Sequence, residues 1–185
     1  PTTDGKLRPD DVQGQCFDME FVHRAQPGAV SITQSSEMGT VYSPDEVSAL
    51  AEVAHANNLA LHMDGARLSN AAASLHVPVR AFTVDAGVDL VSFGLTKNGA
   101  MAAESVIVLN DDRVQGVDFL RKTSMQLASK MRFLSAQFVA MLTDDLWLRS
   151  AGHANAMACR LQDGVGDLSG VTITQSVDAN AVFVL

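Results

Sequence analysis

Two stretches of this sequence decide its fold: Leu59-Ala-Leu-His-Met-Asp-Gly-Ala-Arg67 and Val91-Ser-Phe-Gly-Leu-Thr-Lys-Asn-Gly99. Each begins as an apolar run typical of a buried strand and ends in polar groups. The first run leads to Asp64 and Arg67, and the second leads to Lys97. Because ligands bind outside the carboxyl ends of strands in open parallel sheets, these three side chains are candidate functional residues.

A carboxylate and a lysine at neighbouring strand ends are two groups that a pyridoxal phosphate enzyme requires. The lysine amine forms a Schiff base with the cofactor aldehyde, and the carboxylate keeps a proton on the pyridine nitrogen. Taken singly, Asp64 is more simply explained as a helix cap, and Lys97 and Arg67 as surface side chains. His62 fits a hydrogen-bonded core histidine on the same strand face as Asp64. The functional interpretation therefore depends on these residues occurring together and in this order.

Length and composition indicate one folded domain of ordinary size with part of a second. The chain has 185 residues, of which 47% are hydrophobic and 18% are charged, so it can form a core. Its net charge of −8 disfavours non-specific binding to nucleic acid or to an anionic membrane surface. No run reaches the roughly 20 apolar residues of a membrane helix. Cys16 and Cys159 lack partners at metal-ligand spacing, so we predict no metal site and expect reduced thiols in the cytoplasm.

Apolar periodicity predicts alternating strands and helices, which is typical of an α/β protein with a mostly parallel sheet and helices on both faces. One helix begins after Ser43, with Pro44 at its first position and Glu46 three residues after the cap, and it ends at Asn57. The last two strands of the sheet are too close in sequence for a helical crossover and should be antiparallel. The predicted strands are 29–33, 59–64, 89–95 and 104–109, and the predicted helices are 8–15, 44–56, 66–75, 79–85, 112–143 and 144–163.

A change from alternating units to long helices predicts a domain boundary near residue 150. We expect residues 1–150 to belong to a large domain that includes its long connecting helix. Residues 151–185 should begin a smaller C-terminal α+β domain, with strands at 171–174 and 181–185. The last of these strands has no flanking turn residues, and the sequence opens in a turn-like segment. From these two ends we expect an interior piece of a longer protein.

The segment His62-Met-Asp-Gly-Ala-Arg67, followed by Leu68 and Asn70-Ala71, closely resembles the low-specificity L-threonine aldolases. These are fold-type I pyridoxal phosphate enzymes of the β-eliminating lyase superfamily. Residues 89–101, Asp-Leu-Val-Ser-Phe-Gly-Leu-Thr-Lys-Asn-Gly-Ala-Met, resemble the lysine segment of its phenylserine-aldolase-like branch. The similarity extends over nearly the whole chain. It includes Asp4-Gly-Lys-Leu7, Glu37-Met-Gly-Thr-Val-Tyr42, Arg121-Lys122 and Ser129-Lys-Met-Arg-Phe133.

The resemblance implies a role for each matching residue. Lys97 would form the Schiff base with pyridoxal 5'-phosphate, and Asp64 would pair with its pyridine nitrogen, so these two are the implied catalytic residues. Arg67 would bind the substrate carboxylate, for which a guanidinium fork is suited. Thr96 would lie beside the phosphate or aldehyde side of the cofactor. Lys122 matches a basic position close to the active site in dimers of the family, which makes it a further implied cofactor-binding residue.

Other parts of the family pattern match less closely or lie elsewhere. Lys130 and Arg132 match loosely, and one of them would reach the phosphate of a neighbouring subunit. A solvated helix face explains these two residues and Lys122 equally well. The family's phosphate-binding glycine segment and ring-stacking histidine precede the matched region, and a second carboxylate-binding arginine lies beyond Leu185. Lys97 is followed by Asn-Gly-Ala-Met, where the better-known branch has a Gly-Leu-Gly-type turn.

The activity implied is retro-aldol cleavage of β-hydroxy-α-amino acids, of threonine or phenylserine type, to glycine and an aldehyde. Two alternatives stay open: β-elimination or transamination with the same aspartate and lysine, and an inactive fragment or oligomerisation module of the same fold. Dinucleotide binding is not predicted, because the sequence has no G-x-G-x-x-G after a strand and no phosphate-binding P-loop. Since fold-type I enzymes share sites across a dimer interface, the resemblance implies a cytoplasmic homodimer or homotetramer acting on a small amino acid.

Overall fold

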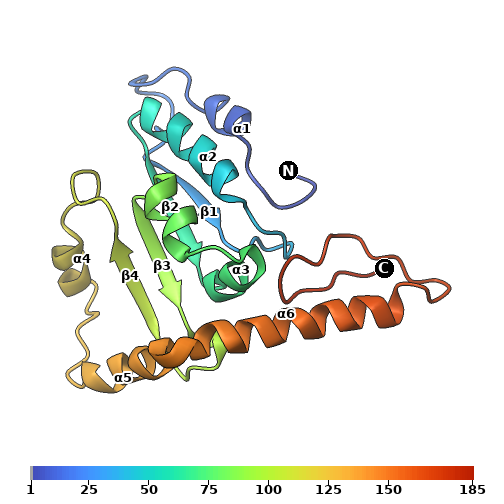
Figure 1. The fold of residues 1–185 in the computed structure, drawn as a ribbon. Coiled ribbons are helices and arrows are strands. Elements are labelled where there is room, and N and C mark those ends of the chain that lie inside the picture. The colour runs from blue at the N-terminus through green and yellow to red at the C-terminus, as the bar shows by residue number, and fades with distance from the viewer. Residues whose placement is uncertain (1) are drawn as a thin grey trace.

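A four-stranded sheet with a layer of helices against it makes up residues 2–185, which are the residues that the computed structural model describes (Figure 1). The strands lie in the order β1-β2-β3-β4, and they span Ala29–Thr33, Ala60–Gly65, Leu90–Gly94 and Glu104–Val108. β1, β2 and β3 are parallel, and β4 is antiparallel to β3. The predicted mostly parallel α/β sheet, with its antiparallel last pair, is therefore confirmed.

The α-helices of the described residues are α1 to α6, which span Pro9–Gln13, Pro44–Ala56, Leu68–Leu75, Val117–Thr123, Met131–Leu142 and Leu146–Val165. α2 begins where its capping signals predict. The Ser43 hydroxyl accepts a hydrogen bond from the Glu46 N–H at 3.2 Å, and the Ser43 N–H donates to the Glu46 carboxylate at 2.8 Å. These reciprocal bonds satisfy two backbone N–H groups at the start of the helix, and so they fix its first turn.

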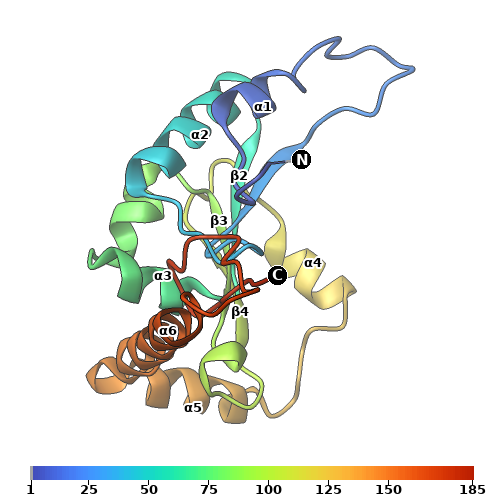
Figure 2. The same cartoon turned by 90° about the vertical axis from the view of Figure 1, so that its right-hand side faces the viewer.

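The two faces of the sheet differ in chemistry and in cover. Helices α2, α3 and α6 lie on one side of the sheet (Figure 2), and the side chains that face them are apolar and buried. On the other face the strands carry partly or fully exposed polar side chains, and α4, which lies on that side at the β4 edge, has no buried residue. We expected helices on both faces of the sheet. Within residues 2–185, the helices that pack closely against the sheet all lie on one face. The buried face is formed by Val30, Ile32, Leu61, Met63, Val91 and Phe93.

The long helix predicted over 112–143 is wrong in one respect, because the chain breaks it into α4 and α5. Gly116 precedes α4 with φ 72°, and Met125 follows it in the left-handed region with φ 55°. The Gln126 N–H then donates to the Arg121 carbonyl at 2.9 Å, which closes the helix end in the manner of a Schellman motif. The residues between 124 and 130 consequently form a loop.

Three further predicted elements, one helix and two strands, are less regular than expected. The helix expected over 79–85 is a pair of single 3₁₀ turns, Val79–Phe82 and Val84–Ala86, because Thr83 between them has φ −122° and ψ −100°. The strands expected at 171–174 and 181–185 reduce to one antiparallel bridge between Ile173 and Val184. α6 continues without interruption through residue 150, and the domain boundary placed there stays a prediction. Within residues 2–185, every helix is too short or too polar to cross a membrane.

A buried carboxylate at the amino end of β3 joins three elements. The Asp89 side chain is 1% exposed, and its Oδ2 accepts a hydrogen bond from the Leu61 N–H of β2 at 2.8 Å and lies 2.9 Å from His55 Nε2 of α2. Its Oδ1 accepts from the Asn110 amide at 2.8 Å, just beyond β4. The Asp89 backbone carbonyl accepts from the N–H groups of Leu109 and Asn110. A buried charge with this many donors is stabilising only while all of them are in place.

The substitution Asp89→Ala removes the acceptor for buried donors on Leu61, His55 and Asn110. We expect the free energy of unfolding to fall by roughly 3 kcal/mol, measured by urea denaturation. Asp85→Ala is the matched control, because Asp85 pairs with Arg80 on the exposed surface and should change the midpoint little. Equal midpoints for the two variants would show that Asp89 does not hold these elements together.

Ion pairs hold the N-terminal segment against the start of α2. Lys6 Nζ donates to Glu46 Oε2 at 2.8 Å, and Arg8 Nη1 donates to Glu46 Oε1 at 3.1 Å. Partial burial on its own raises the pKa of Glu46. The hydrogen bonds from Lys6 and from the Ser43 N–H, together with the charges of Lys6 and Arg8, outweigh burial and lower the pKa of Glu46 overall.

Because the pKa of Glu46 is lower in the folded chain, its carboxylate contributes stability above its ordinary pKa of 4.5, and this contribution is lost as the pH falls through the lowered value. Glu46→Gln should therefore be less stable than the wild type at neutral pH, and the difference should close below about pH 4.5. Urea denaturation across a pH series measures this. Glu52→Gln, at an exposed position of the same helix, should show no such closing difference. A difference for Glu46→Gln that is constant with pH would contradict the expectation.

Candidate active site

Four of the predicted site residues gather at the carboxyl ends of neighbouring strands. Asp64 is the second-last residue of β2 and is paired in register with Ser92 of β3. Arg67 is the N-cap of α3, two residues after β2. Thr96 and Lys97 lie in a single 3₁₀ turn, Thr96–Asn98, which directly follows β3, and both side chains are exposed. Since β2 and β3 are adjacent and parallel, these residues share one edge of the sheet.

The Asp64 carboxylate is held at one oxygen and open at the other. Its Oδ1 accepts a hydrogen bond from the Ala66 N–H at 2.9 Å, and within residues 2–185 its Oδ2 has no hydrogen-bond partner. Gly65 keeps the two strands close at this point, because a Cβ there would lie 2.9 Å from the Ser92 carbonyl oxygen. The carboxylate therefore has a fixed direction and a free acceptor at the strand end.

His62 joins three strands on the open face of the sheet. Its Nδ1 lies 2.8 Å from the Ser31 hydroxyl of β1, and its Nε2 lies 2.9 Å from the Ser92 hydroxyl of β3. The hydrogen-bonded histidine on the Asp64 face is as expected, although its side chain is half-buried rather than enclosed in the core. The two serines were not predicted as its partners. Strand alternation places each of them on this face, but the pairing depends on the register between strands, which the sequence does not encode locally.

Arg67 and Thr96 each have one contact that was not predicted. Arg67 Nη1 lies 3.5 Å from Oε1 of Glu37, an exposed residue in the otherwise largely buried loop that follows β1. The Thr96 hydroxyl oxygen accepts a hydrogen bond from the Ala103 N–H at 3.1 Å, across the turn that carries Lys97. Since that bond uses only an acceptor site, the Thr96 hydroxyl hydrogen remains available for donation.

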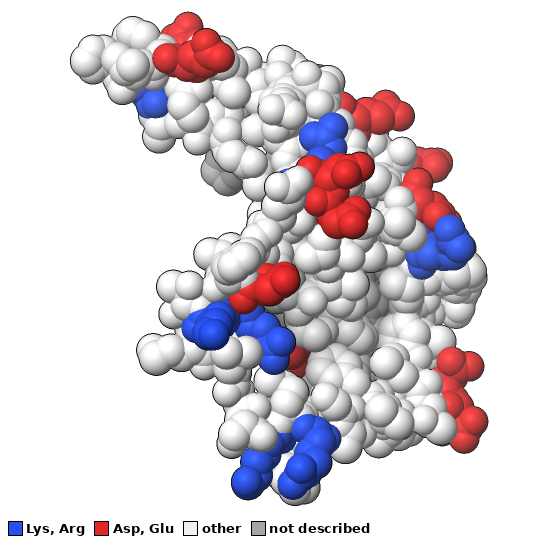
Figure 3. All heavy atoms as spheres, turned by 90° about the vertical axis from the view of Figure 1, so that its left-hand side faces the viewer, with Lys and Arg blue, Asp and Glu red and all other residues white. Residues whose placement is uncertain are grey.

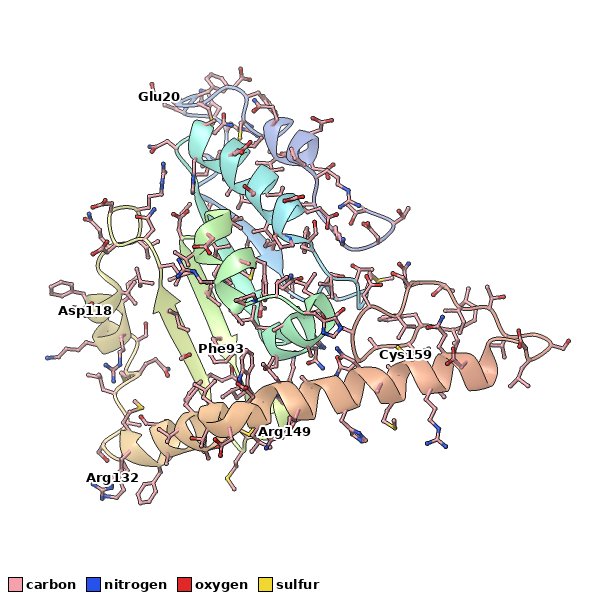
Figure 4. All side chains as sticks on the ribbon, viewed as in Figure 1. Glu20, Phe93, Asp118, Arg132, Arg149 and Cys159 are labelled. Carbon is pink, nitrogen blue, oxygen red and sulfur yellow. The ribbon has the colours of Figure 1, made fainter. Side chains whose placement is uncertain are left out.

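Lys122 does not join the other predicted site residues within one chain. It belongs to α4, which lies beyond the edge strand β4 (Figures 1 and 2). Lys130 and Arg132 come at the start of α5. Figure 3 shows the face on which α4 lies, and there the lysines and arginines form separate groups on the surface. Figure 4 shows that Arg132 points outward. The break between α4 and α5 accounts for the separation of these cations.

Comparison with known proteins shows the family to which the chain belongs. The β-eliminating lyase family model matches residues 1–185. The low specificity L-threonine aldolase of Pseudomonas aeruginosa is 44% identical over 179 residues, which are 97% of this chain and 52% of that protein. Low-specificity L-threonine aldolase 1 of Arabidopsis thaliana is 28% identical over 82% of this chain and 41% of its own length. The chain thus spans about half the length of the curated relatives it matches.

The fold has solved counterparts. The structure of Leishmania major threonine aldolase superimposes with a TM-score of 0.89 at 29% identity, covering all of this chain and 54% of that one. A structure described as a putative L-allo-threonine aldolase from Listeria monocytogenes gives 0.73 at 22% identity, which supports the fold alone. The fold is therefore that of the fold-type I pyridoxal phosphate enzymes, as the sequence resemblance predicts. With the family model matched from end to end, the chain belongs to the β-eliminating lyase family.

Proposed function

We propose that this protein is a pyridoxal-phosphate-dependent aldehyde-lyase that cleaves β-hydroxy-α-amino acids, of threonine or phenylserine type, to glycine and an aldehyde. One observation carries the proposal: Asp64 lies at the carboxyl end of β2, Lys97 follows the adjacent parallel strand β3 at the same sheet edge, and Arg67 lies two residues beyond β2. Relatives named low-specificity L-threonine aldolases, which are 43–44% identical over 97% of the chain, support the choice of reaction.

The residues at this edge fit pyridoxal phosphate by their chemistry. Lys97 has an exposed amine that would hold the cofactor covalently, and the free Asp64 oxygen would accept the N–H of the pyridine ring. The Thr96 hydroxyl keeps a hydrogen for an anionic oxygen while it accepts the Ala103 N–H. When bound, the cofactor supplies an electron sink for the pair released as the Cα–Cβ bond breaks.

The protein's own task is to orient the substrate and to fix charges before the reaction. The Arg67 guanidinium, at the N-cap of α3, would bind the amino-acid carboxylate and so orient the substrate. The Asp64 side chain would hold a proton on the ring nitrogen by charge and hydrogen bonding. Because its Oδ1 is fixed by the Ala66 N–H, the carboxylate needs no reorganisation when it does so.

We further propose that the protein acts as a cytoplasmic homodimer or homotetramer. Cys16 and Cys159 are free thiols, which suits a reducing compartment. α4 and α5 carry exposed apolar side chains, including Phe119, Leu120 and Phe133, of the kind that oligomer interfaces cover. In this assembly Lys122 serves the site of a second copy, and either Lys130 or Arg132 contributes charge for a phosphate there.

Replacing Lys97 tests the proposed attachment point. Borohydride reduction of the protein loaded with pyridoxal phosphate should leave a reduced phosphopyridoxyl group on Lys97, located by intact mass and peptide mapping. Lys6, which is ion-paired with Glu46, should carry none. Lys97→Ala should lose turnover altogether, because no other lysine occupies this turn. Full activity in Lys97→Ala would overturn the assignment. Ammonia and a keto acid, in place of glycine and an aldehyde, would favour β-elimination or transamination.

The substitution Asp64→Asn tests the role of the negative charge at nearly constant shape. An asparagine oxygen can still accept the Ala66 N–H, but it cannot hold a proton on the ring nitrogen by charge. We expect kcat to fall by roughly a hundredfold or more, measured by aldehyde release. Asp85→Asn, at an exposed ion pair, is the control and should keep wild-type activity. Equal activity of the two variants would exclude this role for Asp64.

A further inference from the structure

Lys97 lies in a closed turn with little packing of its own. The base of the turn is joined by a hydrogen bond from the Leu95 N–H to the Ala103 carbonyl at 2.8 Å. Between these residues Thr96, Lys97 and Gly99 are exposed, and Met101 is 90% exposed. Backbone hydrogen bonds from Asn98 and Ala100 to the Leu95 carbonyl close the 3₁₀ turn itself. Burial does not hold the outer residues Met101 and Ala102, and their N–H groups depend on acceptors from elsewhere.

One glutamine of α5 supplies most of those hydrogen bonds. Gln137 Oε1 accepts from the N–H groups of Met101 at 2.9 Å and of Ala102 at 3.0 Å. Gln137 Nε2 donates to the Phe133 carbonyl of its own helix at 3.1 Å, and this fixes which end of the amide faces the turn. The amide thus has one orientation, with its oxygen directed at two backbone donors that follow Lys97 closely.

The residue directly after Lys97 is joined to α6. Asn98 Nδ2 donates to the Trp147 carbonyl at 2.8 Å. Both helices are anchored to β3 through Phe93, whose ring lies 5.9 Å from that of Phe138 and 6.4 Å from that of Trp147, between ring centroids. Figure 4 shows Phe93 where β3 meets these helices. Gln137 is next to Phe138 in sequence, so its place against the turn is set by this aromatic contact.

We propose that Gln137 is a positioning residue for Lys97, with Asn98 as its counterpart on the α6 side. This proposal rests on the proposed function, in which Lys97 holds the cofactor. The two amides keep the turn in one conformation, so that the Lys97 amine is directed to a constant place at the sheet edge. Because the reaction depends on orientation, losing these hydrogen bonds should slow it even when the fold stays intact.

The test uses two nearly isosteric substitutions at one position, made in the full-length protein. Gln137→Glu keeps an acceptor for Met101 and Ala102, whereas Gln137→Met keeps the length of the side chain and removes the acceptor. Gln162→Met, in α6, is the control, because no side-chain hydrogen bond of Gln162 occurs among residues 2–185. Urea midpoints establish that each variant folds.

The first readout is hydrogen exchange of the Met101 and Ala102 amides in the cofactor-free protein. We expect exchange roughly tenfold faster in Gln137→Met, and near wild-type exchange in Gln137→Glu and Gln162→Met. The second readout is the rate at which added pyridoxal phosphate attaches to Lys97. Absorbance follows this attachment, and borohydride reduction makes it permanent for mapping. The rate should fall only in Gln137→Met. In turnover, kcat should fall roughly tenfold in that variant while KM changes less than about twofold.

The outcomes separate this inference from the proposed function. Wild-type exchange and attachment rates in Gln137→Met, with Lys97 loaded normally in the wild type, would overturn the positioning role and leave the proposed function intact. A wild type that takes no pyridoxal phosphate at Lys97 would overturn both. Should Gln137→Met fail to fold, Asn98→Ala replaces it, since it removes only the bond to the Trp147 carbonyl at a partly exposed site. Unchanged exchange across the turn in that variant would equally overturn the inference.

Discussion

The hydrogen bonds of the buried Asp89 carboxylate are the constraint on which the rest of the structure depends. They join β2, α2 and the end of β4 at the amino edge of the sheet. Since they set how β3 lies against β2, they also fix the register that pairs Asp64 with Ser92 at the opposite edge. A residue far from the candidate site thus decides which strand ends meet there. A one-residue slip would turn every side chain of β3 to the other face.

The contrast between the two faces of the sheet explains why the chemistry gathers on one of them. Apolar side chains such as Leu61 and Met63 are buried under the helices, so alternation leaves His62 and Asp64 on the open face. There the polar groups avoid the cost of burial, and His62 bonds to serines on both neighbouring strands. Core packing and placement of the functional groups therefore follow from the same period-two pattern.

Local signals in the sequence predicted those parts of the fold that local chemistry determines. The Ser43 capping box predicted where α2 begins, and the short connection between β3 and β4 predicted their antiparallel pairing. The break after α4 escaped prediction because a methionine, Met125, adopts the left-handed conformation that a glycine would have signalled. Asp64, Arg67 and Lys97 were predicted as a group because each lies at or just beyond the carboxyl end of a strand. The contacts of Gln137 were not, since they join segments far apart in the chain.

The pairing of β3 with β4 has a consequence for how the chain folds. These strands are joined by a short connection, whereas β1, β2 and β3 meet only through long crossovers that contain α2 and α3. Contacts between residues close in sequence incur little loop-closure entropy and tend to form early. The turn that carries Lys97 is the tip of this most local pair of strands. During folding the two strands that carry this turn can pair before the parallel strands assemble, and the turn is completed later by its hydrogen bonds to α5 and α6.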